Sequence, residues 1–299
     1  MNILEETKLI LKKYKIEANK NLGQNFLISD EVVDGIIEAA DITSNDLVIE
    51  IGPGLGVLTN RLLDNAYKVI AVELDERMVK IISERFILSK NLEIINQDIL
   101  KVDLNKVIED NKEQAESDGI EIGKVKIVAN LPYYISTPII MKLLEERLKI
   151  DSIIVMVQKE VADRLIAEPG TKKSGAITYA VDYFSQASDI LKVEKECFIP
   201  SPKVESKVIK LEVRKEPKIL VENEKILFDI IKKVFSQRRK TLVNVLLNYN
   251  IVESKEHAIK ILKEIGLKED VRGETLTLEQ YETLCRKMVK LWFFSKLFT

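Results

Sequence analysis

Short β-favouring runs alternate with helical patterns through the first half of the chain, and this alternation constrains the fold more than any other feature. The runs lie at residues 46–52, 68–74, 92–98, 126–131 and 152–158, with helical patterns between most of them. Such alternation is typical of a mostly parallel sheet covered by helices on both faces. We therefore predict an α/β fold with an open, Rossmann-like sheet.

Two later β-favouring runs, at residues 189–198 and 206–214, are joined by the short segment "IPSPKVE". That segment has no room for a crossover helix, so the two runs should form an antiparallel hairpin at one edge of the sheet. Residues 105–123 form a polar stretch with two glycines, which we predict to be a surface insertion.

The sequence pattern changes after Glu216-Pro217. Only helical patterns follow, at residues 224–249, 254–266 and 278–291. We therefore predict two domains, one over residues 1–215 that holds the sheet and a small all-helical one over residues 216–299.

Composition excludes several classes of site and location. The two cysteines form no spaced set, and the 299 residues include a single histidine, which argues against metal catalysis and against a serine-histidine-aspartate triad, so we expect no metal. No apolar run reaches the roughly 18 residues that a membrane span needs. We expect a cytoplasmic monomer without a membrane partner.

A glycine-rich turn follows the first of the β-favouring runs, in "VIEIGPGLGVLT". Gly52 and Gly54 let the backbone approach a ligand that a Cβ would repel, although the turn could also be an ordinary tight strand-to-helix connection. The spacing is GxGxG and differs from the GxGxxG of dinucleotide enzymes. It favours S-adenosylmethionine over NAD.

Acidic residues end the next two strands. Glu73 stands 21 residues after Gly52, where a carboxylate can accept from both ribose hydroxyls of a nucleoside cofactor. Asp98 could accept from the adenine amine, and a turn-forming role is about equally compatible with its position. Ligands of open α/β sheets bind beyond the carboxyl ends of strands, which supports one cofactor site here.

The fourth run ends in "VKIVANLPYYIST". Asn130 offers a side-chain carbonyl, and Pro132 holds the neighbouring backbone carbonyls in fixed directions. Two acceptors at one point would bind both N–H groups of an adenine amine and stabilise the positive charge that develops as its nitrogen attacks a methyl group. Tyr133 then offers a ring on which the base can stack. We expect Ser136 and Thr137, not Asn130, to cap the following helix.

The run "KKVFSQRRK" at residues 232–240 holds five basic residues and no acidic one. On a continuous helix Arg239 would lie only about 20° from Phe228, inside the apolar stripe. Either the helix breaks near Ser236 or the arginine is held for a partner such as phosphate. We predict that RNA-binding residues lie in this run, at Arg238, Arg239 and Lys240.

If this basic run is only a solvated helix face, RNA recognition would instead involve the loop around Lys172 or the N-terminal lysines Lys12, Lys13, Lys15 and Lys20.

Several motifs together resemble one family. "NKNLGQNFL", "EIGPGLGVLT", "NLPYYISTPI", "CFIPSPKVESKV" and "FSQRRKTL" occur in this order, as in the bacterial small-subunit ribosomal RNA adenine dimethyltransferases, whose loss gives kasugamycin resistance. The resemblance spans roughly residues 19 to 285. It implies S-adenosylmethionine-dependent N6,N6-dimethylation of two adjacent adenosines in the 3′-terminal hairpin of 16S rRNA, with a precursor of the small ribosomal subunit as the partner.

The resemblance also implies roles for three further residues. Asn25 and Leu27 should line the cofactor pocket, and Phe198 should face the target base opposite Tyr133, although Phe198 could also be plain core filling. Two other functions stay open: dimethylation of a large-subunit adenine, and a ribosome assembly factor for which binding alone is essential. A leucine at position 131 and the "SQRRK" motif favour the small-subunit enzyme.

Overall fold

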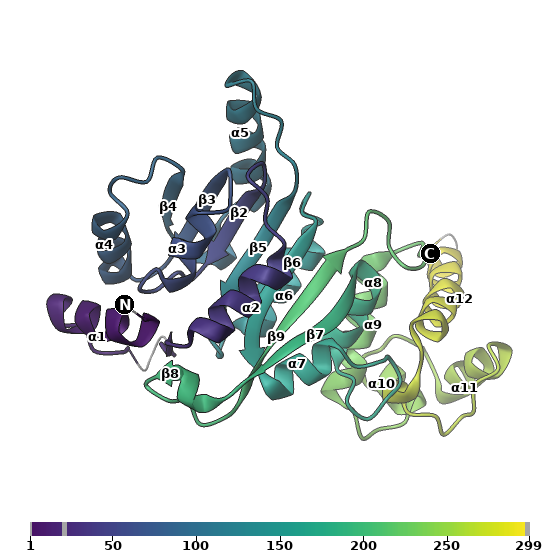
Figure 1. Ribbon diagram of the computed structural model, residues 1–299. Helices are drawn as coiled ribbons and strands as arrows, with labels where there is room; N and C mark the ends of the chain where they lie inside the picture. Colours follow the sequence, from purple (N-terminus) through teal and green to yellow (C-terminus); the bar gives the residue numbers. More distant parts are fainter. Residues whose placement is uncertain (1, 20–22, 297–299) are drawn as a thin grey trace. The chain divides into compact units, whose positions relative to one another are not determined.

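The computed structural model describes residues 2–19 and 23–296, so Lys20 lies outside the described residues. The chain forms two compact units, drawn in Figure 1. The first comprises residues 1–162 and 186–213, and the second comprises residues 163–185 and 214–299. The second unit thus includes a segment, 163–185, that the sequence-based division at residue 215 groups with the catalytic domain.

A mixed sheet forms the centre of the first unit. Within the described residues, seven strands form this sheet in the order β4-β3-β2-β5-β6-β9-β7. β2 to β6 run parallel and β9 pairs antiparallel with β6, so the predicted mostly parallel α/β sheet with an antiparallel edge is confirmed. The strands are β2 (Leu47–Ile51), β3 (Lys68–Glu73), β4 (Leu92–Asn96), β5 (Val125–Asn130), β6 (Ser152–Gln158), β7 (Ser185–Val193) and β9 (Ser206–Val213).

The central strands are buried on both faces, which explains why their sequences are apolar throughout and do not alternate. All five residues of β2 are buried, and Ile51 at its end pairs with Val72 of β3 and Ala129 of β5. The carboxyl ends of the three strands therefore lie at one edge of the sheet.

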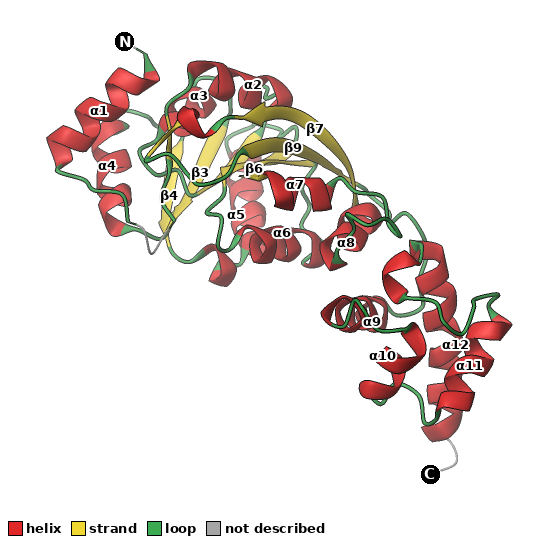
Figure 2. Cartoon of the chain, turned by 90° about the horizontal axis from the view of Figure 1, so that it is seen from below, coloured by secondary structure: helices red, strands yellow, loops and turns green. Residues whose placement is uncertain are grey.

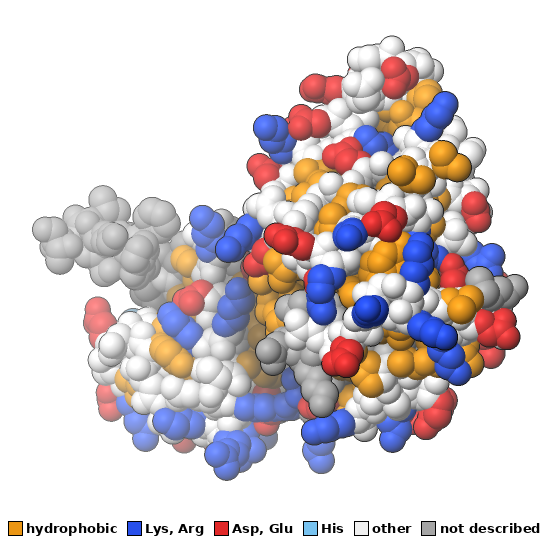
Figure 3. Space-filling view, turned by 90° about the vertical axis from the view of Figure 1, so that its left-hand side faces the viewer, with side chains coloured by type: hydrophobic (Ala, Val, Ile, Leu, Met, Phe, Trp, Pro, Cys, Tyr) orange, Lys and Arg blue, Asp and Glu red, His pale blue; other side chains and the backbone are white. Residues whose placement is uncertain are grey.

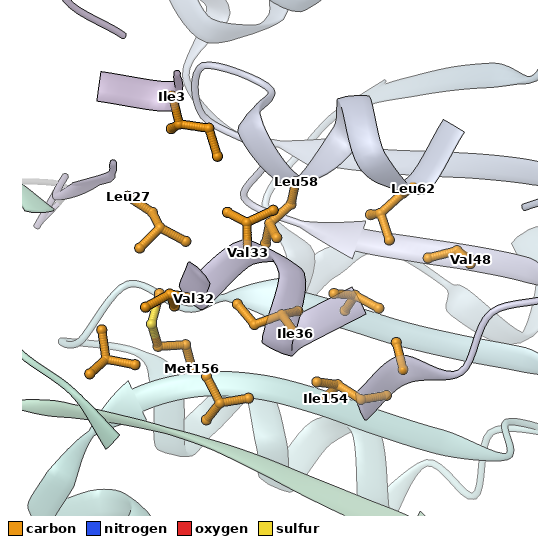
Figure 4. Packing of buried hydrophobic residues seen from close by; sticks show 14 of the residues in the cluster. Ile3, Leu27, Val32, Val33, Ile36, Val48, Leu58, Leu62, Ile154 and Met156 are labelled. Carbon is orange, nitrogen blue, oxygen red and sulfur yellow. The ribbon is translucent and has the colours of Figure 1, made fainter. Parts of the chain in front are cut away.

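Helices cover both faces of this sheet (Figure 2). α2 and α3 lie on one face, and Val33, Ile36 and Leu62 pack there against Val48 and Ile154 of the sheet (Figure 4). The helices of the first unit are α1 (Ile3–Tyr14), α2 (Asp30–Ala40), α3 (Val57–Leu63), α4 (Glu76–Arg85), α5 (Leu104–Ser117) and α6 (Ser136–Glu145), and α7 (Lys159–Leu165) runs from the first unit into the second.

α5 corrects one expectation. The segment 105–123, predicted as a surface insertion, is mostly this crossover helix between β4 and β5. Leu104, Ile108 and Ala115 are buried along one side of it, while the other positions are mostly polar and exposed. Apolar residues at this helical spacing bury one stripe and leave the rest to solvent.

Aromatic packing joins the segment 163–185 to the C-terminal helices of the second unit. Tyr179 lies on α8 (Ala176–Phe184), and its ring contacts those of Phe235 and Tyr281 at centroid distances of 5.5 and 5.2 Å. Tyr183 contacts Phe228 at 5.4 Å in an edge-to-face arrangement. The remaining helices are α9 (Glu224–Ser236), α10 (Leu242–Asn248), α11 (Lys255–Glu264) and α12 (Leu278–Lys296).

The helix expected over 224–249 breaks after Ser236, which settles one alternative left open by the sequence. Across residues 2–19 and 23–296, no helix combines the length and the apolar character that crossing a membrane requires.

Candidate active site

A pocket opens at the carboxyl ends of β2, β3 and β5. Nine residues singled out from the sequence line it, namely Asn25, Leu27, Gly52, Gly54, Glu73, Asp98, Asn130, Pro132 and Tyr133. They come from five separate segments of the chain. The parallel topology brings these segments together, because the ends of neighbouring parallel strands meet at one edge.

The glycine-rich turn between β2 and α3 forms the floor of the pocket. Gly52, Gly54 and Gly56 have φ values of 68°, 57° and 81°, a conformation that side chains rarely adopt. A Cβ on Gly56 would lie only 2.6 Å from the Phe86 ring, so packing also requires that glycine. Around Gly52 and Gly54 the nearest atoms lie 3.8 Å or more from such a Cβ. At these two positions the positive φ, and not a steric clash, is therefore the reason for glycine.

Glu73 ends β3 with a buried carboxylate held by the backbone. One oxygen accepts from the Asp75 N–H at 2.9 Å and the other from the Gly54 N–H at 3.2 Å. Burial raises the pKa of Glu73 above its ordinary value. The expected cap of α4 is confirmed at Asp75, whose side chain accepts from the Arg77 N–H at 3.0 Å.

Glu50 is a pocket residue that sequence reasoning missed. It lies in β2 two residues before Gly52, and only 1% of its surface is exposed. Its carboxyl accepts from the buried Thr59 hydroxyl at 2.6 Å. Burial, with the nearby charge of Glu73, raises the pKa of Glu50 to about 8. An acid inside the otherwise apolar run "LVIEI" was the signal for it.

Asp98 fulfils the turn role weighed for it from the sequence. One of its carboxylate oxygens accepts from the Leu100 N–H at 3.0 Å, which begins a short 3₁₀ helix at Ile99–Lys101. The side chain still borders the pocket, so the turn role and a ligand role are compatible.

A short strand pair borders the pocket near Asn25. β1 (Phe26–Leu27) pairs antiparallel with β8 (Phe198–Ile199), a pairing that the sequence did not predict. The Asn130 amide nitrogen donates to the Asn25 backbone carbonyl at 3.4 Å. Because the Asn130 amide nitrogen makes this hydrogen bond, the amide oxygen points away from the Asn25 carbonyl.

The chain turns sharply after Asn130. The Leu131 N–H donates to the Met156 carbonyl at 3.1 Å, and the Ile135 N–H donates to the Pro132 carbonyl at 3.2 Å. The N-cap position of α6 is Ile135, which provides no side-chain cap, so the expectation that Ser136 and Thr137 cap it is wrong. The Ser136 hydroxyl instead donates back to the Tyr133 carbonyl at 3.3 Å.

Tyr133 has a partner that sequence reasoning missed. Its hydroxyl lies 2.6 Å from the Ser206 hydroxyl, and Ser206 is the first residue of β9. Burial raises the pKa of Tyr133, so the phenol stays protonated near neutral pH. Tyr134 is exposed beside it, and its ring lies against Gly23.

Phe198 differs from the expectation that it faces the target base. Only 3% of its surface is exposed, and it belongs to the buried cluster that includes Leu27, Val32 and Met156. It pairs with Leu27 across the β1–β8 ladder. The structure therefore favours core filling, the alternative left open by the sequence.

The predicted RNA-binding run lies in the second unit, at the turn between α9 and α10. Arg238 forms an ion pair with Glu274 and donates to the Lys172 carbonyl. Its guanidinium also lies 5.9 Å from the Phe235 ring centroid. Arg238 is therefore bonded within the protein, whereas Arg239 and Lys240 are exposed to solvent.

Charged side chains of both signs are spread over the face of the molecule shown in Figure 3, with acidic groups among the lysines and arginines. On this face, therefore, the basic side chains are not separated from the acidic ones.

Comparison with known proteins adds independent findings. A family described as ribosomal RNA adenine dimethylase matches residues 15–284. Ribosomal RNA small subunit methyltransferase A of Alkaliphilus metalliredigens is 46% identical over 283 residues, which cover 95% of this chain and 96% of that protein. The Clostridioides difficile protein of the same name is 45% identical over 278 residues, 93% of each chain.

Two solved structures resemble this one. A dimethyladenosine transferase from Plasmodium falciparum is 27% identical, with a TM-score of 0.71, over 89% of this chain and 98% of that chain. The 23S rRNA methyltransferase ErmE is 23% identical, with a TM-score of 0.63, over 89% of this chain and 100% of that chain. The second likeness shows the shared fold.

Proposed function

This chain belongs to the ribosomal RNA adenine dimethylase family, and from that premise we propose that it dimethylates adenine N6 in small-subunit ribosomal RNA. The proposed targets are two adjacent adenosines in the 3′-terminal hairpin of 16S rRNA, methylated during ribosome biogenesis. The observation that carries the proposal is the pocket at the strand ends, where Glu73 and Asn130 lie together.

The residues of the pocket fit S-adenosylmethionine, which supplies a methyl group on a sulfonium sulfur when bound. Glu73 is the residue we assign to the ribose, because its two oxygens are fixed by backbone N–H groups and border the pocket. Gly52 and Gly54 leave room for backbone approach, and Asp98 is placed for the adenine amine. Asn25 and Leu27 also line this pocket.

Asn130 and the backbone before Pro132 are proposed to bind the substrate amine. The Asn130 amide nitrogen is engaged by the Asn25 carbonyl, which leaves the amide oxygen to accept from the adenine N6 group. The Leu131 carbonyl is the second acceptor, with its direction set by the proline ring. Both would strengthen their bonds as positive charge develops on nitrogen, an effect worth about 3 kcal/mol for a group of this kind.

Tyr133 is proposed to stack on the target base. The base must leave its stack in the RNA to reach a pocket at the strand ends, and an aromatic face compensates for lost stacking by about 1–3 kcal/mol. Its hydroxyl contacts Ser206 and is protonated near neutral pH, so the residue acts as a surface and not as a base. The methylated amine can lose its proton to solvent.

Arg239 and Lys240 are proposed to bind RNA phosphates from the second unit. Both are exposed in the turn between α9 and α10. Arg238 is reassigned: its ion pair with Glu274 and its bond to the Lys172 carbonyl give it a structural role. It supports the turn that presents its two neighbours.

A small-subunit substrate is favoured over a large-subunit one by the relatives. Proteins named for the small subunit are 46% and 45% identical across nearly the whole chain, whereas the large-subunit enzyme ErmE is 23% identical. A role in ribosome assembly by binding alone is a further candidate, and the intact Asn130 pocket argues that catalysis accompanies any such role.

The test is mass spectrometry of the 3′ fragment of 16S rRNA from unmethylated subunits incubated with the purified protein and S-adenosylmethionine. A mass gain of four methyl groups on the adjacent adenosines is expected. Methylation of 23S rRNA instead, or of neither RNA, would refute the proposal.

A further inference from the structure

We propose that Ser206 is a positioning residue for the methyl transfer, and that it acts by holding the Tyr133 ring in the orientation that receives the base. The inference rests on the proposed function, and it adds a residue from β9 to the site at the ends of β2, β3 and β5. Ser206 is fully buried, and its hydroxyl lies 2.6 Å from the Tyr133 hydroxyl.

The bond reaches across one strand of the sheet. Tyr133 follows β5, Ser206 begins β9, and β6 lies between those two strands. Ser206 pairs with Gln158 at the end of β6, so its backbone position is set by the sheet. A tyrosine ring on a turn can rotate about two side-chain torsions. The phenolic oxygen lies on the axis of the second torsion, so a hydrogen bond there restricts mainly the first torsion, which sets where the ring lies.

The residue before Ser206 is fixed by two lysines. The Glu205 carboxylate binds Lys159 at 2.8 Å and Lys192 at 2.7 Å, and these lysines lower its pKa to about 2. The Glu205 carbonyl also accepts from the Lys159 N–H at 3.0 Å. Lys159 starts α7 and Lys192 lies in β7, so two elements hold the strand end that presents Ser206.

The arrangement fits a stacking surface better than a proton acceptor. A tyrosine that removed a proton from the amine would need its hydroxyl free and its pKa lowered. Here the Tyr133 hydroxyl is hydrogen-bonded to Ser206, and burial raises the pKa of Tyr133. The hydroxyl therefore serves to orient the ring, and Ser206 provides the fixed point.

The experiment is a double-mutant cycle on methyl transfer to an unmethylated 16S rRNA substrate. Ser206→Ala and Tyr133→Phe each remove the bond, and each should lower kcat/KM about 2- to 12-fold, the effect of one neutral hydrogen bond. The double variant should be no slower than the slower single variant, because the same bond is lost only once. Ser206→Thr keeps a hydroxyl at this position and should retain activity.

A second readout reports the ring directly. With 2-aminopurine in place of the target adenine, stacking on Tyr133 quenches its fluorescence, and Ser206→Ala should weaken that quenching while cofactor affinity by calorimetry stays unchanged. Ser185→Ala is the matched control, because Ser185 is also buried and its hydroxyl donates to a backbone carbonyl, that of Val181, at 2.9 Å. A merely structural serine would change thermal stability and leave the quenching alone.

The possible outcomes separate the positioning role from the proposed function. Additive losses in the double variant, or unchanged kcat/KM in Ser206→Ala, would overturn the positioning role. Should Ser206→Ala not fold, Tyr133→Phe tests the same bond from its other end. A wild-type protein that methylates no RNA would refute the proposed function itself.

Discussion

Replacing Glu50 with glutamine should make the folded protein less sensitive to alkaline pH. Glu50 is 1% exposed, and its pKa is raised from 4.5 to about 8 by burial first and by the charge of Glu73 second. Between these two values the folded chain binds a proton that the unfolded chain releases. Because the folded pKa is the higher one, stability is full below pH 4.5 and is lost as pH rises through 8.

The magnitude follows from linkage. Each pH unit inside that window lowers the free energy of unfolding by about 1.4 kcal/mol, so raising the pH from 5 to 8 should cost about 4 kcal/mol through Glu50. Glutamine matches the shape of the protonated acid and carries no charge at any pH. The variant should therefore gain about 4 kcal/mol relative to the wild type across this range.

Urea denaturation followed by circular dichroism, at pH 5.0, 6.0, 7.0 and 8.0, measures the difference. Glu73 is present in both proteins, so its own titration largely cancels in the comparison. Glu116→Gln, at an exposed position of α5, controls for the loss of a carboxylate and should parallel the wild type. Parallel pH curves for wild type and Glu50→Gln would refute the reasoning.

The other predictions concern ligands and RNA. Asn130→Ala should lower methyl transfer about 100-fold or more in a folded protein, with cofactor affinity measured separately, and near-normal turnover would contradict the acceptor role. Glu73→Ala should weaken S-adenosylmethionine binding by about 1.5–3 kcal/mol in calorimetry, whereas unchanged affinity would remove the ribose assignment. Arg239→Ala with Lys240→Ala should reduce the slope of log affinity for rRNA against log salt by about 1.4–1.8. Arg238→Ala should instead lower the melting temperature, and the opposite pattern would restore Arg238 as a phosphate ligand.

The strand ends could be predicted because two independent patterns agree there. Buried parallel strands are continuous apolar runs, and polar residues directly after such runs must lie at one edge of the sheet. Glu73 and Asn130 each stand at the end of such a run, which is why their places in the pocket could be predicted from the sequence. Gly52 adds the backbone conformation that the turn requires.

The residues missed or misplaced depend on contacts between distant segments. Ser206 meets Tyr133 across 73 positions of the chain, and neither spacing nor periodicity reports such a pair. Phe198 was assigned by its motif, but its pairing with Leu27 directs it into the core. Arg238 was grouped with its basic neighbours, although Glu274, 36 residues away, binds it.

The chain passes between its two units three times, after residues 162, 185 and 213. Exchange of the C-terminal helices between relatives by a single recombination event near residue 215 would therefore divide one unit between two parents. Tyr179 and Tyr183 would come from one parent and their aromatic neighbours on α9 and α12 from the other. Inheritance of the second unit as a movable module is thus disfavoured, and its sequence should diversify together with the segment 163–185.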